Sequence, residues 1–370
     1  MASITGVSDA TSPRSLAEVT ATWLTLRLQA HGVDAEVASF RSEGLGEVHG
    51  LLAELQRLHL TYGRGDGPKS LIIKFWAASE QNREVGLRFG VYRREVLFYR
   101  DAAAATGMAL PVVYAAEIDD DDAFVLLMED LGHLRTGDQV AGCSVADAEA
   151  CMDELVKLHS TYWNSVDGPE FDFAPHVNGP VNGDPLCQAA EACWPLMLEK
   201  IGHAVPAEMQ AAGPSIVAAF AAMQAHLGTA PITLIHSDFR LDNLMLGTRP
   251  EDPKVVTLDW QGALRGRGIQ DVAFFLSQNL EVELRRANER ALVERWRTGL
   301  AAHGIDAGTA DEVWADYRRA VLYCWLYPIV IAGSLDATSE RGTQMTVAMV
   351  SRSAAAILDL DCLSLLPELG

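Results

Sequence analysis

A polar run between two short apolar strands constrains the fold more than any other stretch of this chain. It reads TLIHSDFRLDNLMLG and occupies residues 233–247. The apolar and β-branched residues 232–235 are typical of a buried strand, and a second apolar run, 244–246, follows after only a few positions. The polar residues between these two runs are therefore predicted to form a loop that is pinned at both ends.

The hydrophobic pattern changes near residue 130. Before this point it predicts three strands, a helix and two strands, and after it a series of alanine-rich amphipathic helices with two short strands among them. We expect an α+β chain with a β-rich lobe over residues 1–130, a larger helical lobe over residues 131–370, and a ligand-binding cleft between the lobes. The expected helices are 15–30, 85–105, 145–163, 187–201, 215–227, 271–278, 280–303 and 309–331, and the expected strands are 35–40, 51–62, 69–76, 112–118, 124–129, 232–235 and 255–258.

The composition excludes several classes of protein. The 370 residues are 49% hydrophobic, which is typical of a soluble globular chain with a real core. No stretch approaches the roughly 18 apolar residues of a membrane helix, and no apolar core follows a basic start at the N-terminus, so we expect a cytoplasmic protein without membrane insertion. A net charge of −21 disfavours nucleic acid as a partner. The six cysteines have no C-x-x-C spacing, which favours reduced packing residues over a zinc site or a disulfide framework.

The loop carries chemically useful side chains in the order H-x-D-x-x-x-x-N. These are His236, Asp238 and Asn243, and Asp259 stands at the end of the next predicted strand. Phosphoryl transfer needs such a set, because one carboxylate orients an attacking hydroxyl and accepts its proton while an amide oxygen and a second carboxylate hold Mg²⁺ on the phosphates. The spacing therefore indicates a phosphotransferase.

Residues upstream of the loop fit the same chemistry. Lys74 lies in the apolar strand LIIKF, where an unpaired ammonium group would be costly, and Glu95 in the following helix is placed to pair with it. Such a pair would fix the lysine against nucleotide phosphates, and Gly44, Gly46 and Gly50 would let a hairpin backbone approach them closely. Each feature alone has a plainer explanation: a strand-edge lysine that reaches water, a surface glutamate or a tight hairpin.

Three segments, LIHSDFRLDNLML, LDWQ and FVLLMEDLG, resemble the protein-kinase-like phosphotransferases of small molecules, namely the aminoglycoside phosphotransferase and choline kinase-like families. They are most similar to the ecdysteroid kinase-like branch, and the resemblance covers residues 40–276 in order. It implies a bilobal fold, in which a small antiparallel β-sheet lobe carries one key helix and the other lobe is mainly helical. It also implies ATP as the donor, Mg²⁺ as a cofactor and a small hydroxylated molecule as the acceptor.

The resemblance also implies a role for each residue that matches a motif. Asp238 would be the catalytic base, Asn243 and Asp259 would bind Mg²⁺, and Lys74 with Glu95 would position the phosphates.

Further roles concern support of the site. His236 would hold the catalytic loop together, and Asp271 would begin a helix and brace that loop. The hinge that reads adenine through backbone groups would follow the last strand of the small lobe and comprise Met128, Glu129, Asp130 and Leu131.

The chain also departs from the family pattern. Ser237 stands where the family usually has glycine, and the magnesium segment reads Asp-Trp-Gln instead of Asp-Phe-Gly. An Ala-Pro-Glu element is absent from the sequence, and only a short stretch separates Asp259 from Asp271. A regulated activation loop and a protein substrate are therefore not expected.

The sequence leaves alternatives open. A catalytically silent pseudokinase would keep the nucleotide site, and a metal-dependent hydrolase would use His236 and Asp238, which alternate on an extended segment but have no third ligand nearby in sequence. Residues 164–185 would form a lid or a surface connection, and no motif names the acceptor or excludes GTP as donor. Six aromatic residues would pack in the core or line an acceptor pocket: Tyr162, Trp163, Trp194, Tyr323, Trp325 and Tyr327.

Overall fold

The computed structural model describes residues 11–45, 52–334 and 340–368. The chain divides into two compact units. The first contains residues up to 104 together with residues 110–133, and the second contains residues 105–109 and everything from residue 134 onward. Each unit has its own hydrophobic core.

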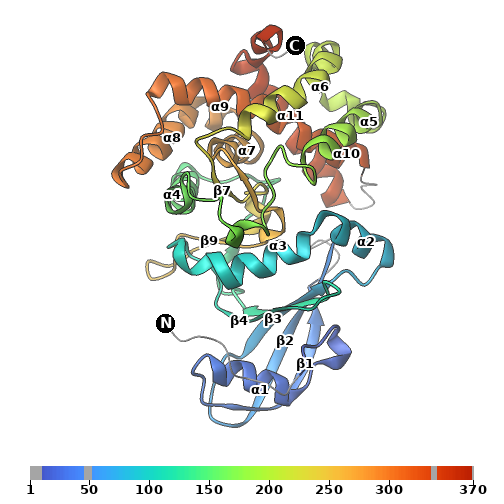
Figure 1. Ribbon diagram of the computed structural model, residues 1–370, viewed down its shortest axis with the longest axis vertical. Helices are drawn as coiled ribbons and strands as arrows, with labels where there is room; N and C mark the ends of the chain where they lie inside the picture. Colours follow the sequence, from blue (N-terminus) through green and yellow to red (C-terminus); the bar gives the residue numbers. More distant parts are fainter. Residues whose placement is uncertain (1–10, 46–51, 335–339, 369–370) are drawn as a thin grey trace. The chain divides into compact units, whose positions relative to one another are not determined.

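The first unit is built on a five-stranded antiparallel sheet (Figure 1). Its order is β1-β2-β3-β5-β4, so β3 lies in the centre with a neighbour on each side. Central strands tolerate apolar side chains on both faces, and β3 is accordingly rich in β-branched and aromatic residues. The strands are β1 (Glu36–Gly44), β2 (Ala53–Arg64), β3 (Ser70–Trp76), β4 (Val113–Ile118) and β5 (Phe124–Glu129).

One face of this sheet packs against α1 (Ala21–Ala30), whose N-terminus is capped by the Thr20 hydroxyl. The apolar core here includes Leu71, Ile73 and Phe75 of β3. Because side chains alternate along a strand, Lys74 points to the opposite face of the sheet. The expected helix 15–30 is wrong at its start, because residues Leu16–Glu18 form a separate 3₁₀ turn that ends before Thr20.

The expected continuous helix 85–105 is also wrong. The structure has α2 (Glu80–Phe89) and α3 (Val91–Leu97), and Gly90 separates them with a φ of 65°. A glycine readily adopts this left-handed conformation and ends a helix there. The periodicity of the apolar residues does not reveal such a helix end. A π-type turn at Phe98–Ala102 then follows α3.

The second unit is mainly helical, and α7 lies at its centre. Every residue of α7 is buried, so other parts of the unit pack around the whole helix. The polar residues of α7 therefore need hydrogen-bond partners inside the unit. Around it lie α4, α8, α9 and α11, while α5 packs against α6 and α10. The helices are α4 (Val145–Tyr162), α5 (Gly183–Ile201), α6 (Ala207–Leu227), α7 (Ile269–Asn279), α8 (Val282–Ala302), α9 (Ala310–Cys324), α10 (Leu326–Ser334) and α11 (Glu340–Asp359).

Two expectations about these helices fail. The predicted helix 309–331 is two helices, α9 and α10, which are separated at Trp325. The sequence pattern did not predict α11 at all. The sequence of α11 is nevertheless amphipathic, since the buried residues Met349, Val350 and Ser353 recur at a helical spacing while Gln344 is exposed.

Short strands frame the central loop of the second unit. β7 (Thr233–Ile235) pairs with β10 (Leu264–Gly266), and a separate sheet has the order β6-β8-β9. The latter strands are β6 (Arg135–Thr136), β8 (Leu244–Leu246) and β9 (Val255–Thr257). The polar run of the sequence therefore leaves β7 and enters β8, as the pinned-loop prediction required.

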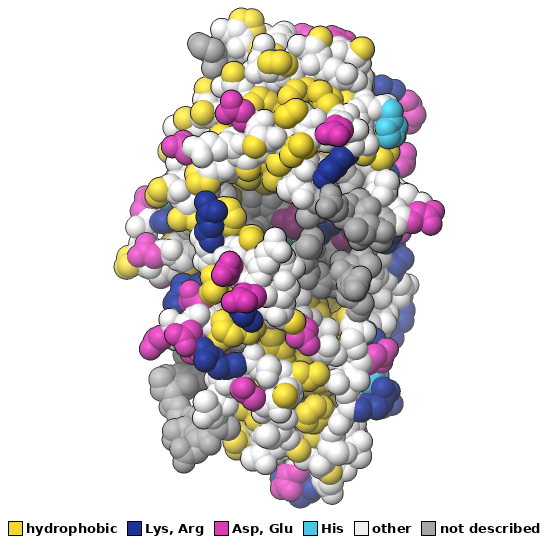
Figure 2. Space-filling view, turned by 90° about the vertical axis from the view of Figure 1, so that its right-hand side faces the viewer, with side chains coloured by type: hydrophobic (Ala, Val, Ile, Leu, Met, Phe, Trp, Pro, Cys, Tyr) yellow, Lys and Arg dark blue, Asp and Glu magenta, His cyan; other side chains and the backbone are white. Residues whose placement is uncertain are grey.

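The remaining general features are simple. All six cysteines are free thiols. Figure 2 shows acidic and basic side chains interspersed over the visible face, so the excess negative charge does not gather there in one patch. None of the described helices combines the length and apolar character that a membrane-spanning helix needs. Of the six aromatic residues singled out in the sequence, Tyr162, Tyr323 and Trp325 are buried and the other three are partly buried against the core.

Candidate active site

The loop after β7 is held by one buried carboxylate. Asp271, in the first turn of α7, accepts the backbone N–H of His236 through Oδ2 at 2.7 Å and that of Ser237 through Oδ1 at 2.8 Å. Both donors would otherwise be buried without partners, which costs about 1–3 kcal/mol each. Ser237 has a φ of 65°, so the chain turns sharply just after these two bonds. The side chain of Asp271 thus fixes the direction in which the loop leaves β7.

A second layer of buried groups orients Asp271. Trp296 donates its Nε1–H to Nδ1 of His159 at 2.9 Å, so the proton of the imidazole resides on Nε2, which lies 3.3 Å from Asp271 Oδ2. A Cβ at Gly268 would lie 2.7 Å from His159 Nδ1, so the close approach of the chain to this ring requires glycine. The roles of His159 and Trp296 could not be predicted from the sequence, because both residues occupy ordinary core positions of their helices.

His236 has a structural position in the loop. Its Nε2 donates to the carbonyl oxygen of Leu258 at 2.9 Å, and its Nδ1 accepts the backbone N–H of Asp238 at 3.2 Å. Both ring nitrogens are thereby occupied, and the ring also lies against Trp260 at a centroid distance of 4.6 Å. The imidazole joins the end of β9 to the loop and sets the backbone of Asp238.

Asp238 and Asn243 form a direct pair. The amide group of Asn243 donates through Nδ2 to the carbonyl oxygen of Asp238 at 2.9 Å and to its Oδ2 at 2.8 Å. Since the amide nitrogen is committed to Asp238, the amide oxygen is the atom that Asn243 offers to a ligand. Asp238 itself is 37% exposed along its side chain, so its carboxylate is accessible while its backbone is fixed.

Asp259 follows β9 in a left-handed conformation, with φ 62° and ψ 71°. Leu258 donates its N–H to the carbonyl oxygen of Asn243 at 2.9 Å, which places this segment beside the Asn243 backbone. A Cβ at Gly262 would lie 2.9 Å from the carbonyl oxygen of His236, so the turn after Asp259 also packs closely on the loop. The structure thus folds the Asp259 segment onto the loop that carries Asp238 and Asn243.

The donor set fits a magnesium ion. Mg²⁺ prefers oxygen ligands and retains several waters or phosphate oxygens, so one amide oxygen and one carboxylate, from Asn243 and Asp259, suffice from the protein. Among the residues described, no three His, Cys, Asp or Glu side chains lie together as a metal site.

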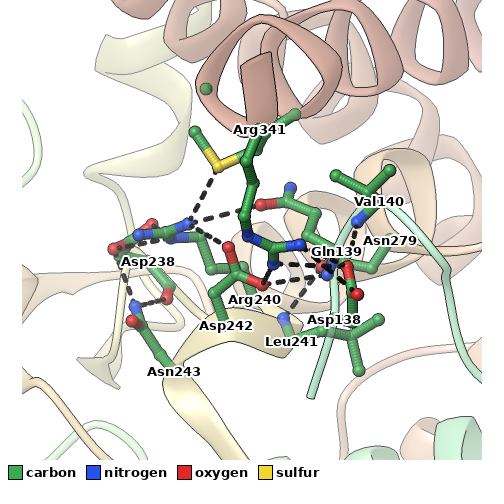
Figure 3. A network of polar contacts seen from close by, with 12 residues as sticks. Asp138, Gln139, Val140, Asp238, Arg240, Leu241, Asp242, Asn243, Asn279 and Arg341 are labelled. Carbon is green, nitrogen blue, oxygen red and sulfur yellow. Dashed lines mark hydrogen bonds and ion pairs between the residues drawn. The ribbon is translucent and has the colours of Figure 1, made fainter. Parts of the chain in front are cut away.

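Arg240 is a site residue that the sequence analysis missed. Its guanidinium lies beside the Asp238 carboxylate, with Nε 3.2 Å from Oδ1, and Nη1 lies 3.3 Å from Asp242 Oδ2 (Figure 3). Burial lowers the pKa of Arg240, but the charges of Asp238, Asp242 and Asp259 outweigh it and raise the pKa. The only sequence signal was a basic residue between two aspartates in the loop.

The first unit contains the predicted ion pair of Lys74 and Glu95. Nζ of Lys74 on β3 lies 2.8 Å from the carboxylate of Glu95 on α3, and the two side chains are 5% and 1% exposed. Lys74 points to the sheet face opposite α1, and α3 supplies Glu95 on that face. Removing one partner would leave a buried charge without compensation, so the two residues depend on each other for burial.

The structure describes part of the predicted glycine-rich hairpin and all of the predicted hinge. Gly44 is the last residue of β1 and pairs with Gln56, whereas Gly46 and Gly50 lie outside the described residues. At the predicted hinge, Met128 and Glu129 end β5 and Leu131 is buried. The Asp130 carboxylate does not project freely, because it accepts hydrogen bonds from the side chains of Arg57 and Ser70 and from the backbone of Gly132.

Solved structures of similar fold include small-molecule kinases. A microcompartment-associated aminopropanol kinase matches with 18% identity and a TM-score of 0.53 over 94% of this chain and 98% of its own. The ethanolamine kinase of Plasmodium vivax matches with 12% identity and a TM-score of 0.53 over 89% of this chain and 86% of its own. The choline kinase of Cryptosporidium parvum matches with 10% identity and a TM-score of 0.52 over 89% and 93% of the two chains. At these identities the likeness establishes the fold.

The sequence comparisons establish the family. A search of curated proteins found no significant match. The family model of the ecdysteroid kinase-like proteins, however, matches residues 49–308, which is more than half of the chain and includes Lys74, Glu95 and the loop from His236 to Asn243. The α+β fold and the resemblance inferred from the motifs are thereby confirmed, and the chain belongs to the ecdysteroid kinase-like family.

Proposed function

We propose that this protein is an ATP- and magnesium-dependent kinase that transfers the γ-phosphate to the hydroxyl group of a small molecule. The observation that carries the proposal is the Asp238–Asn243 pair in a loop anchored by Asp271. A fixed backbone with an accessible carboxylate is what a base needs in order to orient an attacking hydroxyl. Neither the buried ring of His236 nor Asp271 has such access, which singles out Asp238.

Each residue has a specific role in this proposal. Asp238 orients the acceptor hydroxyl and takes its proton, and Asn243 and Asp259 hold Mg²⁺ through their side-chain oxygens. The ion, when bound, neutralises charge on the phosphate oxygens. Lys74, positioned by Glu95, binds a phosphate of the nucleotide.

In this proposal the two units have different functions. We assign nucleotide binding to the β-rich part of the chain, including Gly44 and the hinge residues Met128 to Leu131, and acceptor binding to the helical part. The similar structures include kinases of aminopropanol and ethanolamine, so amino alcohols belong among the acceptors tested, together with sugars, sterols and antibiotics. GTP should be compared with ATP in the same assay.

The test is release of ADP from ATP and Mg²⁺ across a library of hydroxylated compounds, with calorimetry of nucleotide binding alongside. Asp238→Asn should bind ATP as the wild type does but lose about 10²–10⁴-fold in turnover, which is the usual contribution of a positioned base. Asp259→Ala should lose the dependence on Mg²⁺. Asp361→Asn, whose side chain is 80% exposed and lies outside the loop and outside residues 164–185, is the matched control and should behave as wild type.

The outcomes separate the candidate functions. Undiminished turnover in the Asp238→Asn protein would contradict the proposed mechanism. Nucleotide binding without turnover on any compound would favour a pseudokinase. Absence of nucleotide binding, with a tightly bound zinc or iron ion instead, would favour a hydrolase.

A further inference from the structure

Ser237 places a hydroxyl group directly before the proposed base Asp238 in the chain. The residue is 6% exposed, and its Oγ lies 3.1 Å from the hydroxyl oxygen of Tyr327 on α10. Among the residues that the structure describes, Oγ of Ser237 has no second hydrogen-bond partner. Serine departs from the family pattern at this position, so the role of this hydroxyl is a property of this chain.

This hydroxyl is the first in a row of three within the second unit. Burial raises the pKa of Tyr327, and hydrogen bonds with Ser237 and Tyr323 act against this rise. Tyr327 therefore lies between the other two hydroxyl groups. The two phenol rings also meet edge to face, with centroids 6.2 Å apart. Tyr323 is fully buried, whereas Tyr327 is half-buried.

The row of hydroxyl groups has more protons than acceptors. Gln270 donates through Nε2 to Tyr327 at 3.0 Å, so this nitrogen cannot accept a hydroxyl proton. Gln224 likewise donates through Nε2 to Tyr323 at 2.9 Å. Three O–H protons then share two contacts between oxygen atoms, and one hydroxyl remains a donor without an acceptor within the described ranges of the chain. At Tyr323 an unpaired donor would lie in the core, which is costly, so the unpaired proton belongs to Ser237 at the other end of the row.

The Ser237 hydroxyl is held in place from both sides. The backbone N–H of Ser237 donates to Asp271 Oδ1 at 2.8 Å, and the Tyr327 ring packs edge to face on Phe274 with centroids 5.2 Å apart. A donor fixed in this way loses little freedom when it binds a ligand. The side chain of Asp238 is 37% exposed, and adjacent Cα atoms lie about 3.8 Å apart. A molecule bound to the Asp238 carboxylate therefore lies within a few bonds of the Ser237 hydroxyl.

We propose that Ser237 is a substrate-binding residue, whose hydroxyl donates a hydrogen bond to an oxygen atom of the acceptor beside the hydroxyl group that is phosphorylated. The inference rests on the proposed function of the loop. It narrows the acceptor to molecules with a hydroxyl, carbonyl or carboxylate oxygen on the carbon next to the reacting one. An amino group there is protonated at about pH 7 and has no lone pair, so it would leave the Ser237 donor unpaired.

Other roles of the hydroxyl predict different results. If it only joined the loop to α10, its removal would change turnover on all acceptors by the same factor. A bond from Ser237 to the γ-phosphate would also affect all acceptors equally, because each receives the same group. Only a bond to the acceptor changes the ratio of kcat/KM between acceptors with and without the neighbouring oxygen. Because this ratio is taken within one protein, the fraction of folded enzyme cancels.

The experiment measures kcat/KM, by ADP release, on matched acceptors that share a carbon skeleton and differ only beside the reacting hydroxyl. One set is isopropanol, propylene glycol, lactate and isopropanolamine, and an equivalent set is built on each acceptor found in the library. The wild type should prefer the members with a neighbouring oxygen by about tenfold or more, as expected for one hydrogen bond to a buried donor.

Variants at position 237 separate the hydroxyl from the backbone strain. Ser237→Ala and Ser237→Gly differ in strain but both lack the hydroxyl, so both should lose the preference to within about twofold of equality. Ser215→Ala, which removes an exposed hydroxyl on α6, is the control and should keep the wild-type preference.

The outcomes distinguish this inference from the proposed function. A wild type that uses the isopropanol or amino members as well as the oxygen-bearing members would overturn the inference and leave the kinase assignment intact. A Ser237→Ala protein that keeps the preference would do the same. A wild type that turns over no compound, with or without nucleotide binding, would overturn the proposed function and this inference with it.

Discussion

Ser237 occupies a backbone conformation that costs a residue with a Cβ about 1–2 kcal/mol. Its φ of 65° lies at the turn where the loop leaves β7, next to Asp238. Two contacts offset the strain: its N–H donates to Asp271, and its hydroxyl lies 3.1 Å from the hydroxyl of Tyr327. The side chain therefore links the loop after β7 to α10, which a glycine at this position would not do.

This balance gives a testable order of stabilities. Ser237→Ala keeps the strain and loses the hydroxyl contact, so it should lower the free energy of unfolding by about 1–2 kcal/mol. Ser237→Gly loses the same contact but relieves the strain, so it should be more stable than the alanine variant by about 1 kcal/mol, after allowance for the entropy of glycine in the unfolded chain. Urea unfolding of the three proteins measures the order. An alanine variant at least as stable as the glycine variant would contradict this account of Ser237.

Much of the candidate site was predictable residue by residue. Lys74 was predictable because a charged residue in an apolar strand needs a partner. Asp238 was predictable because the spacing of His236, Asp238 and Asn243 within one loop can be recognised in a single sequence. Arg240, His159 and Trp296 were missed because their importance lies in contacts with segments distant in sequence. A buried tryptophan that donates to a histidine looks, in sequence, like any other core residue.

At the scale of elements, Gly90 separates two helices that the sequence pattern joined. A Cβ at Gly90 would meet no atom within 4 Å, so contacts with neighbouring residues play no part, and only the φ of 65° favours glycine. The break between α2 and α3 allows α3, which carries Glu95, to begin in its own direction. Apolar periodicity predicts that a helix exists, but a single glycine within it can mean either a tolerated residue or a boundary. Apolar periodicity likewise did not predict the break between α9 and α10 at Trp325.

Gly90→Ala tests this explanation of the break. We expect a loss of about 1–2 kcal/mol in the free energy of unfolding, entirely from the left-handed backbone. Gly202→Ala is the matched control, since Gly202 has a φ of −56° and a Cβ there would make only ordinary contacts with Leu198 at 3.8 Å. That variant should be neutral or slightly stabilising. Equal effects of the two substitutions in chemical denaturation would show that the conformation of Gly90 is not what requires glycine.

At the scale of the whole molecule, acidic residues dominate, and their environments decide how the fold responds to pH. Hydrogen bonds from Arg286, more than any other cause, lower the pKa of Asp359. Burial on its own raises the pKa of Asp130, but hydrogen bonds from Ser70 and Arg57 outweigh it and leave the pKa below its ordinary value. Burial raises the pKa of Glu154 and of Glu289. The two groups of carboxylates therefore respond to acid in opposite directions.

The signs follow from linkage. A carboxylate with a lowered pKa stabilises the fold above its unfolded value of about 3.9, and this contribution is lost as pH falls through the lowered pKa. Glu154 and Glu289 act in reverse: their contribution is present below about pH 4.3 and is lost as pH rises through their raised pKa values. Stability should consequently rise somewhat as pH falls from about 7 toward about 4.3, because Glu154 and Glu289 become protonated in the fold, and should fall below about pH 4, where the aspartates lose their ion pairs.

Asp359→Asn makes this prediction specific. Its carboxylate serves both Arg285, which is buried, and Arg286, at 2.8 Å. The variant should be less stable than wild type near pH 7 but should lose less stability on acidification, because one of the protonation steps that opposes folding is gone. Thermal unfolding from about pH 7 to pH 3 measures both effects. Asp361→Asn, whose side chain is 80% exposed and 3.9 Å from Arg318, is the control and should follow wild type. If Asp359→Asn lost stability with acid as steeply as wild type, the acid sensitivity of the fold would have to arise from other carboxylates.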